Sequence, residues 1–366
     1  MKKNILILNN GTIGLCGFRR EVIEEICKNY HVTAAALDNG MLERLQEMGC
    51  DFIPIELEQR GKNLLKELRL RSRIRGLLKE LHPDLVLTYT IKPNIYGGMA
   101  CAALGVPYIA NITGLGTAVE NAGLMQALTL PLYRRGLRKA SMVFFQNEAN
   151  REFMLSRKIV SGPHDLLPGS GVNLERFRLL PYPNGETVDF SFISRVRKEK
   201  GIDQFIDAAK AISARHPEAR FHVYGQCFGE YQKKLEALQQ EGILQYHGYT
   251  KDVAGVHRFS CCTIHPSYYP EGMSNVCLES AACGRPVITT DRPGCIETVE
   301  DGISGYLVRQ KDSGDLIEKI ERFLALSPEE RCAMGLAGRA KMEREFDRNI
   351  VVRKYLELIE TIVEKE

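Results

Sequence analysis

Short runs of apolar residues alternate along the whole chain with longer segments whose apolar residues recur at helical spacing. Near-continuous apolar runs are typical of parallel strands that are covered on both faces, and the helical segments between them would supply the covers. The pattern therefore predicts an α/β fold with parallel sheets. The predicted strands are 5–8, 31–37, 52–55, 85–88, 108–112 and 142–146 in the first half, and 188–194, 220–224, 243–247, 263–265, 286–289 and 305–308 in the second.

The two series of strands predict two doubly wound, Rossmann-like domains, and a chain of 366 residues is long enough for two cores. The boundary is expected in a segment rich in Pro and Gly that follows residue 167. We expect an N-terminal domain over 1–168, a linker over 169–187, a C-terminal domain over 188–345 and an amphipathic helix over 346–366. Ligands of such sheets bind at the carboxyl ends of the strands.

Composition excludes several classes of protein. Hydrophobic residues at 44% and charged residues at 26% are typical of a globular chain, and no apolar run approaches the roughly 20 residues of a membrane span. The first apolar run stops at Asn9 without a cleavage site, which favours a buried strand over a signal peptide. Eleven cysteines without a C-x-x-C pair indicate reduced thiols in the cytoplasm, and their spacing predicts no zinc site.

Positive charge is concentrated in the first half. Residues 1–185 hold 24 Lys and Arg against 17 Asp and Glu, whereas the remaining residues hold 25 against 29. Two interpretations stay open: solvated helix faces, or attraction to anionic lipid head groups or a phosphate-bearing lipid substrate. Nucleic-acid binding is not favoured, because no aromatic residues interleave the basic stretch. The cations are Arg60, Lys62, Lys66, Arg69, Arg71, Arg73, Arg75 and Lys79, followed by Arg134, Arg135, Arg138 and Lys139.

Two glutamates flank a predicted helix start in the second half. An apolar run ends at His265, a Pro-rich loop carries Glu271, and a helical pattern that opens at Gly272 places Glu279 two turns inside. Free backbone amides at a helix N-terminus favour a diphosphate, and the carboxylates would accept hydrogen bonds from sugar and ribose hydroxyls. The pattern favours a nucleotide-sugar site over a plain strand, loop and helix with solvated glutamates. The amides expected to be free are those of Met273, Ser274 and Asn275.

Two cations follow the first predicted strand of the second domain. Arg195 lies just past the strand end and Lys200 lies at the entry to the next helix, before Gly201. Cations there would neutralise charge that develops on a departing diphosphate, which is the task a metal performs elsewhere. A basic surface loop is the alternative. No D-x-D pair suited to Mg²⁺ is present, so we expect neither a metal nor another cofactor.

The first domain carries loops that would face the same edge of its sheet. Gly11 and Gly14 follow the first strand in a G-x-x-G-x-x-G pattern, and Asp38 ends the second, which leaves a nicotinamide dinucleotide as a weak alternative because the middle glycine is missing. Lys92 follows another strand as a candidate phosphate contact. Thr113 and Gly114 follow the next one.

These motifs together resemble the retaining glycosyltransferases of family 4, which have the GT-B fold, over essentially the whole chain. The family's E-x7-E motif matches Glu271 and Glu279, its Arg and Lys match Arg195 and Lys200, and Cys283-Gly-Arg-Pro-Val-Ile is its usual continuation. The segments at 89–94, 113–116 and 293–297 are similar to bacterial members that build surface glycans on undecaprenyl diphosphate.

The resemblance implies a UDP-sugar donor in the C-terminal domain, with Arg195 and Lys200 on the diphosphate, Glu279 on the ribose and Glu271 near the sugar. It implies an acceptor in the N-terminal domain, contacted by Gly11, Gly14, Lys92, Thr113 and Gly114, and a C-terminal helix that returns to that domain. The expected reaction is transfer of an N-acetylhexosamine to a polyprenyl-diphosphate-linked saccharide, on the cytoplasmic face of the inner membrane.

The sequence departs from the family at two positions. Thr113 and Gly114 stand where many members carry a histidine, so a catalytic histidine is not carried over, and Ser194 replaces the glycine usual before the Arg. A UDP-sugar epimerase of GT-B fold and a non-catalytic binding module remain alternatives. The scarcity of histidines speaks against the epimerase, which needs acid and base groups near the sugar.

Overall fold

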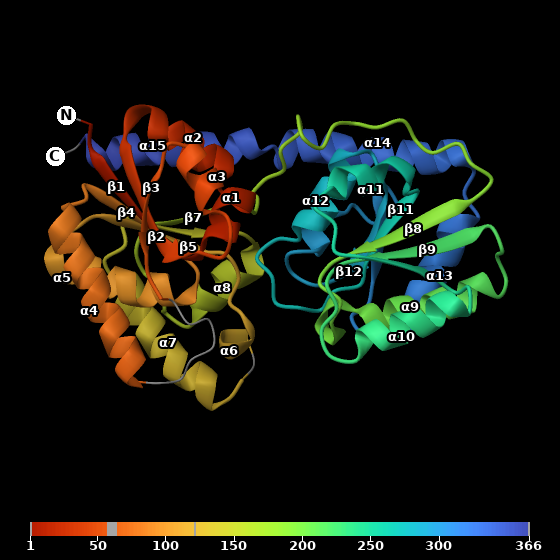
Figure 1. Cartoon of the computed structure of the whole chain (residues 1–366), viewed down its shortest axis with the longest axis horizontal. Coiled ribbons are helices and arrows are strands. Elements are labelled where there is room, and N and C mark those ends of the chain that lie inside the picture. The colour runs from red at the N-terminus through yellow and green to blue at the C-terminus, as the bar shows by residue number, and fades with distance from the viewer. Residues whose placement is uncertain (1, 57–63, 121, 365–366) are drawn as a thin grey trace. The chain divides into compact units, whose positions relative to one another are not determined.

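The computed structural model describes residues 2–56, 64–120 and 122–364 (Figure 1). Arg60 and Lys62 of the first basic stretch lie outside this part of the chain. The N-terminal unit comprises Met1–Ser170, Pro270–Met273 and Arg348–Glu366, and the C-terminal unit comprises Gly171–Tyr269 and Ser274–Asp347. Each unit is built on one sheet of parallel strands with helices on both faces. The predicted α/β architecture of two Rossmann-like sheets is confirmed.

The N-terminal sheet has seven strands in the order β3-β2-β1-β4-β5-β6-β7. The order reverses between β1 and β4, so the topological switch point lies there. Its strands are β1 (Asn4–Gly11), β2 (His31–Leu37), β3 (Asp51–Pro54), β4 (Leu85–Tyr89), β5 (Tyr108–Ile112), β6 (Met142–Phe145) and β7 (His164–Leu166). Its helices are α1 (Thr12–Phe18), α2 (Arg20–Asn29), α3 (Leu42–Glu47), α4 (Leu64–Leu81), the π-helical segment η1 (Pro93–Gly97), α5 (Gly98–Leu104), α6 (Thr117–Glu120), α7 (Leu124–Leu137), α8 (Glu148–Ser156) and α15 (Arg348–Val363).

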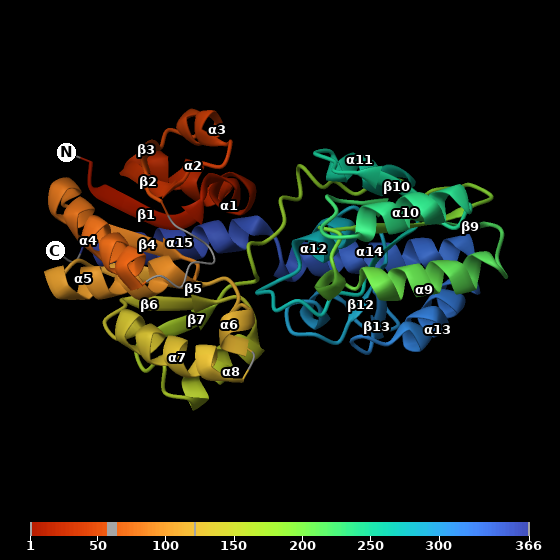
Figure 2. The same ribbon diagram turned by 60° about the horizontal axis from the view of Figure 1, so that its bottom comes forward.

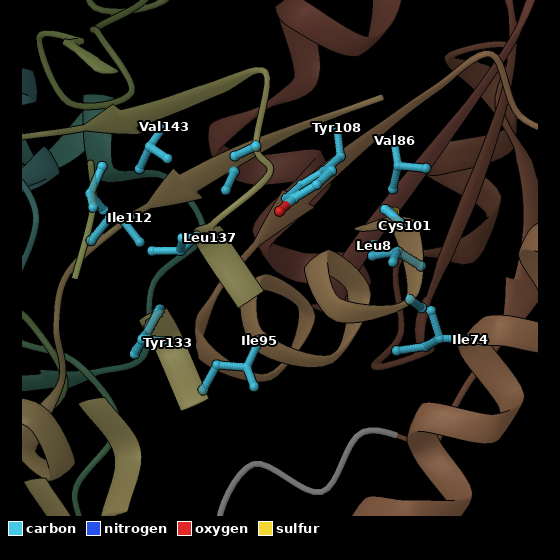
Figure 3. Close-up of a cluster of buried hydrophobic side chains, with 14 of the residues drawn as sticks. Leu8, Ile74, Val86, Ile95, Cys101, Tyr108, Ile112, Tyr133, Leu137 and Val143 are labelled. Atoms are coloured by element: carbon cyan, nitrogen blue, oxygen red, sulfur yellow. The ribbon is translucent and has the colours of Figure 1, made fainter. Parts of the chain in front are cut away.

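Two apolar cores cover the faces of this sheet. One core joins the sheet to α4, α5 and α7, and its side chains converge as Figure 3 shows for Ile74, Tyr108 and Tyr133. The other core contains residues of α1, α2 and α15 (Figure 1). Strands apolar on both sides are what such double covering requires.

Strand β7 was missed by the sequence prediction. It has only three residues, His164–Leu166, and lies at the edge of the sheet beside β6. Two of its residues are polar, so no apolar run marks it. The observed strand is held by backbone pairing with β6 over Val143, Phe144 and Phe145.

The C-terminal sheet has six strands in the order β10-β9-β8-β11-β12-β13. Helices α9 and α13 lie side by side (Figure 2). A core of apolar side chains, which includes stacked Phe190 and Phe221, packs this sheet against α9 and α13. Its strands are β8 (Val188–Ile193), β9 (Ala219–Tyr224), β10 (Gln245–Gly248), β11 (Cys262–His265), β12 (Val287–Thr290) and β13 (Gly305–Val308). Its helices are η2 (Lys198–Lys200), α9 (Ile202–Ser213), α10 (Tyr231–Gln240), α11 (Val253–Phe259), α12 (Asn275–Ala282), η3 (Ile296–Thr298), α13 (Ser313–Leu324) and α14 (Pro328–Glu345).

A buried arginine anchors the segment that leads into this sheet. Arg285 is 0% exposed, and its guanidinium donates to the backbone oxygens of His257 at 2.7 Å, Pro181 at 2.7 Å and Leu180 at 3.3 Å. Burial lowers the pKa of Arg285. The side chain of Arg285 therefore supplies the hydrogen-bond donors for three carbonyl groups that are distant from it in sequence.

We expect Arg285→Met to lower the free energy of unfolding by about 2–4 kcal/mol, because the buried carbonyl oxygens lose their donors. Urea titration followed by circular dichroism would measure this change. Arg322→Met is a suitable control, since Arg322 forms an exposed ion pair with Glu318 and should cost below about 1 kcal/mol. Equal effects of the two substitutions would contradict the anchoring role.

Candidate functional site

Three cations surround one tyrosine ring in the C-terminal unit. Lys200 Nζ lies 5.1 Å from the centre of the Tyr269 ring, and the guanidinium carbons of Arg197 and Arg195 lie at 5.9 Å and 6.0 Å. Arg195 follows β8, which ends at Ile193, and Lys200 closes the 3-10 turn η2. The structure thus brings together the two cations that the sequence singled out. It adds Arg197 and Tyr269, which sequence reasoning missed.

A glycine shapes the backbone after Lys200. Gly201 has φ = +78°, and a Cβ there would lie 2.1 Å from the carbonyl oxygen of Pro266. The left-handed conformation and this close approach both require glycine. The close approach of Pro266, the first residue after β11, therefore restricts the backbone next to Lys200.

Burial sets the charge of Lys200. The side chain is 6% exposed, and burial lowers its pKa to about 8, with the nearby Arg195 charge acting in the same direction. Burial disfavours the charged ammonium at this position. A bound anion would stabilise it strongly, because the surroundings screen charge weakly. The geometry therefore favours binding of an anionic group beside Lys200.

Contrary to the sequence prediction, the backbone amides at the start of the helix after Gly272 are not all free. Helix α12 begins at Asn275, three residues later than the Gly272 start predicted from sequence, so Glu279 lies in its second turn. The backbone N–H of Ser274 donates to the carbonyl oxygen of Gly294 at 2.7 Å and does not point freely into the loop. The prediction for Ser274 was wrong because a loop twenty residues downstream supplies the acceptor.

The start of α12 holds two buried polar atoms with no hydrogen-bond partner in the described part of the chain. They are the Oγ atom of Ser274 and the Oδ1 atom of Asn275. A buried unpaired acceptor in a native fold calls for a bound water, ion or ligand. The loop that accepts the Ser274 amide is itself held by Glu297, whose carboxylate accepts from the Gly294 N–H at 2.7 Å. Burial raises the pKa of Glu297.

The segment that carries Glu271 packs within the N-terminal unit. The Asn147 side chain, which caps α8, donates from Nδ2 to the carbonyl oxygens of Gly272 at 2.6 Å and Glu271 at 3.3 Å. A Cβ on Gly272 would lie 2.3 Å from Gln146 Oε1 and 2.5 Å from the Thr113 carbonyl oxygen. The sequence missed Gln146 and Asn147, although their place at the end of a predicted strand was a usable signal.

Other predicted residues of the N-terminal unit lie as follows. Gly114 has φ = +133°, and a Cβ on it would lie 3.0 Å from the backbone N of Gly272, so Thr113 and Gly114 lie against the Glu271 segment. Gly11 ends β1 and lies against Asn39, and Gly14 lies on α1 near Asn9. Asparagine side chains therefore lie close to the backbone at both Gly11 and Gly14.

Lys92 is engaged by a carboxylate. Its Nζ donates to Glu67 Oε1 at 2.6 Å, and both side chains are mostly buried. Glu67 also acts on Tyr96, where burial and this carboxylate raise the pKa to about 12. A phosphate contact by Lys92 would have to compete with an existing ion pair.

Among the described residues, no three His, Cys, Asp or Glu side chains are grouped so that they could bind a metal ion. Within the same residues, every helix is too short or too polar to span a bilayer.

In comparisons with known proteins, each half of the chain matches a family of glycosyltransferases. Residues 182–341 match the family model "Glycosyl transferases group 1", and residues 5–147 match the model "Glycosyl transferase 4-like". The chain is 25% identical over 344 residues to the N,N'-diacetylbacillosaminyl-diphospho-undecaprenol alpha-1,3-N-acetylgalactosaminyltransferase of Campylobacter jejuni, with 88% of each chain covered. It is 27% identical over 165 residues to the capsular polysaccharide biosynthesis glycosyltransferase CapM of Staphylococcus aureus, which covers 44% of this chain and 42% of CapM.

Solved structures share the fold. Anabaena Alr3699/HepE in complex with UDP and glucose has a TM-score of 0.80 at 18% identity, with 98% of this chain and 100% of that chain covered. A glycosyltransferase from Rickettsia africae has a TM-score of 0.82 at 18% identity over the whole of both chains.

Proposed function

Because the chain belongs to the family 4 glycosyltransferases of GT-B fold, we propose that it transfers a sugar from a UDP-sugar with retention of anomeric configuration. The observation that carries the donor assignment is the group of cations around Tyr269. A nearly buried Lys200 and its positively charged neighbours form a basic site that would attract a diphosphate. The UDP-bound relative HepE supports a uridine nucleotide.

In this proposal, Arg195 and Lys200 bind the diphosphate and the N-terminus of α12 adds its dipole. Gly272, Met273 and Asn275 belong to the donor loop, and Ser274 takes the N-cap position of α12, where its side chain makes no capping hydrogen bond. Glu279 accepts hydrogen bonds from the ribose and Glu271 from the donor sugar. These roles are consistent with the chemistry of each group, since carboxylates accept from hydroxyls.

The proposed chemistry needs no metal. The acceptor hydroxyl oxygen bonds to the anomeric carbon on the side of the leaving group as the bond from that carbon to the phosphate oxygen breaks. The released phosphate oxygen takes the hydroxyl proton, and UDP leaves. Arg195 and Lys200 stabilise the negative charge that develops on the diphosphate, which lowers the barrier.

We further propose that the donor sugar is an N-acetylhexosamine and that the acceptor is a polyprenyl-diphosphate-linked saccharide used in surface glycan synthesis. The support is the similarity to a transferase that acts on diphospho-undecaprenol and to one of capsule synthesis. Gly11, Gly14, Lys92, Thr113 and Gly114 are the proposed acceptor contacts.

The N-terminal unit offers a surface suited to a membrane that carries such an acceptor. Leu124 and Leu128 of α7 are exposed, and α7 ends in exposed cations. An apolar and basic helix is attracted to anionic lipid at the cytoplasmic face. The exposed cations are Arg69, Arg71, Arg73, Arg75 and Lys79 of α4, Arg134 and Arg135 of α7, and Arg138 and Lys139 just beyond it.

The proposal is tested by measuring UDP release from a panel of UDP-sugars, with and without polyprenyl-linked saccharides and without added metal. Release that needs one donor and the lipid fraction together is the expected result. Interconversion of UDP-sugars without an acceptor would indicate the epimerase instead. If no UDP-sugar binds, neither activity is tenable.

UDP affinity should fall as pH rises through about 8. The pKa of Lys200 is lowered to about 8 in the free protein, and a bound diphosphate raises it again, so binding takes up a proton above that pH. The affinity for UDP has its highest value below pH 8 and decreases by up to about tenfold for each pH unit above it. Calorimetric titration from pH 7 to 10 measures this.

The ratio of wild-type to Lys200→Arg affinity corrects for ionisation of UDP itself, because arginine keeps its charge over this range. A ratio that stays constant with pH would exclude Lys200 as the titrating contact.

A further inference from the structure

A buried arginine lies at the switch point of the N-terminal sheet. Arg19 joins α1 to α2 and is 4% exposed. Its guanidinium carbon lies 5.1 Å from the centre of the Tyr89 ring, and Tyr89 is the last residue of β4. Strands β1 and β4 are neighbours at the point where the strand order reverses. Doubly wound sheets bind ligands outside the carboxyl ends of such strands.

One nitrogen of the Arg19 guanidinium has no acceptor within the described residues. This nitrogen, Nη1, is enclosed. The carboxylates that follow Arg19 on α2 pair with other arginines, Glu21 with Arg348 at 2.7 Å and Glu24 with Arg20 at 2.6 Å. A buried charge without a partner costs several kcal/mol, so a native fold supplies an anion or ordered water.

The hydroxyl of Tyr89 is a second enclosed donor. Tyr89 is 2% exposed, and its hydroxyl lies beside that of Tyr355 without an acceptor for its own proton among the described residues. The neighbouring Tyr355 hydroxyl donates to Asn111, so its proton is already used. Burial raises the pKa of Tyr89, which keeps its hydroxyl protonated. A guanidinium and a phenol at one place favour a negatively charged oxygen ligand.

The backbone beside Tyr89 is held in a strained form. Thr90 has φ = +70°, a left-handed conformation that is costly for a β-branched residue. The chain then forms the π-helical segment η1. The Thr88 hydroxyl donates to Asn94 Oδ1 at 2.6 Å, and Asn94 Nδ2 donates to the Asn111 carbonyl oxygen at 2.8 Å, so buried polar contacts fix this geometry. Strain and π-helical turns concentrate at ligand sites.

We propose that Arg19 and the Tyr89 hydroxyl bind a compact oxyanion, a phosphate or a carboxylate, carried by the acceptor. The assignment to the acceptor rests on the proposed transferase function, whereas the anion site itself rests on the buried donors. Guanidinium presents parallel N–H groups that match two oxygens of such an anion, and the phenol adds a third donor. The small exposed fraction of Arg19 favours a compact group over a bulky one.

The test is calorimetric titration of the full chain, saturated with UDP, with inorganic phosphate and separately with acetate. Saturation keeps both anions out of the proposed donor site. We expect one phosphate or acetate to bind per chain, with affinity reduced at least tenfold in Arg19→Gln and several-fold in Tyr89→Phe. The affinity for UDP should be unchanged in both variants. Preference for phosphate or for acetate identifies the source of the oxyanion.

Absence of anion binding to the wild type, or equal binding by the wild type and both variants, would overturn the proposal. Altered thermal stability of the variants with unchanged anion binding would also overturn the proposal. It would indicate that Arg19 only packs on Tyr89. If Arg19→Gln does not fold, Tyr89→Phe keeps the ring and still removes one donor. If the wild type does not bind UDP, the donor proposal fails, and the anion titration is repeated with Lys200→Met.

Discussion

Lys200→Met should produce a protein that is more stable than the wild type and nearly inactive. Lys200 is 6% exposed and its pKa is lowered to about 8, so below pH 8 the folded state holds a charge that the unfolded state solvates better. Removing that charge should raise the free energy of unfolding at pH 7 by up to about 3 kcal/mol. The gain should shrink as pH rises from 8 to 10.5, because Lys200 then loses its proton in the folded state first.

The same substitution should reduce the transfer rate by about 10²–10³, since a buried cation at a developing diphosphate charge contributes a few kcal/mol to the barrier. Turnover with the identified UDP-sugar and denaturant unfolding are measured on the same preparation. Opposite signs of the two effects are typical of a site where function costs stability.

Lys198→Met provides the matched control. Lys198 belongs to the same turn, η2, but is exposed, so the substitution should change stability by less than about 0.5 kcal/mol and turnover very little. If Lys200→Met lowered stability and kept its activity, Lys200 would be a packing residue and not a diphosphate contact.

Glu271→Gln should abolish most transfer while the donor still binds. The segment is held through backbone oxygens, which accept from Asn147 Nδ2, and Gly272 packs against Thr113, so a side-chain change at Glu271 leaves the loop in place. Gln has nearly the same shape but no charge, and it presents donors where the carboxylate accepts. We expect kcat to fall by about 10²–10³ with UDP affinity within about twofold of the wild type.

The readout separates binding from chemistry. UDP affinity is measured by calorimetry and transfer by product formation with acceptor present. Glu152→Gln, on the exposed side of α8 in the same unit, should leave both values unchanged. Transfer at the wild-type rate in Glu271→Gln would remove this carboxylate from the proposed mechanism, and a parallel loss of UDP affinity would reassign it to donor binding.

Much of the fold was predictable from local patterns. Apolar strands such as β5, expected over 108–112, occur as Tyr108–Ile112, because a strand buried on both faces leaves an unbroken apolar run. Strand β7 has no such apolar run, since its pairing with β6 is made by the backbone. The start of α12 was placed too early, because Gly272 is held by Asn147 and not by helical hydrogen bonds.

The sequence by itself determined the two series of parallel strands and the chemical groups of the proposed donor site, Arg195, Lys200, Glu271 and Glu279, since apolar periodicity and residue type are local properties. Only the tertiary structure decided their electrostatic state. Lys200 is buried beside Tyr269, and the Ser274 amide is taken by Gly294, which are contacts between residues far apart in the chain. The buried charge of Arg19 on Tyr89 has the same origin. Burial and pairing depend on which distant segments pack together, and no local pattern encodes that.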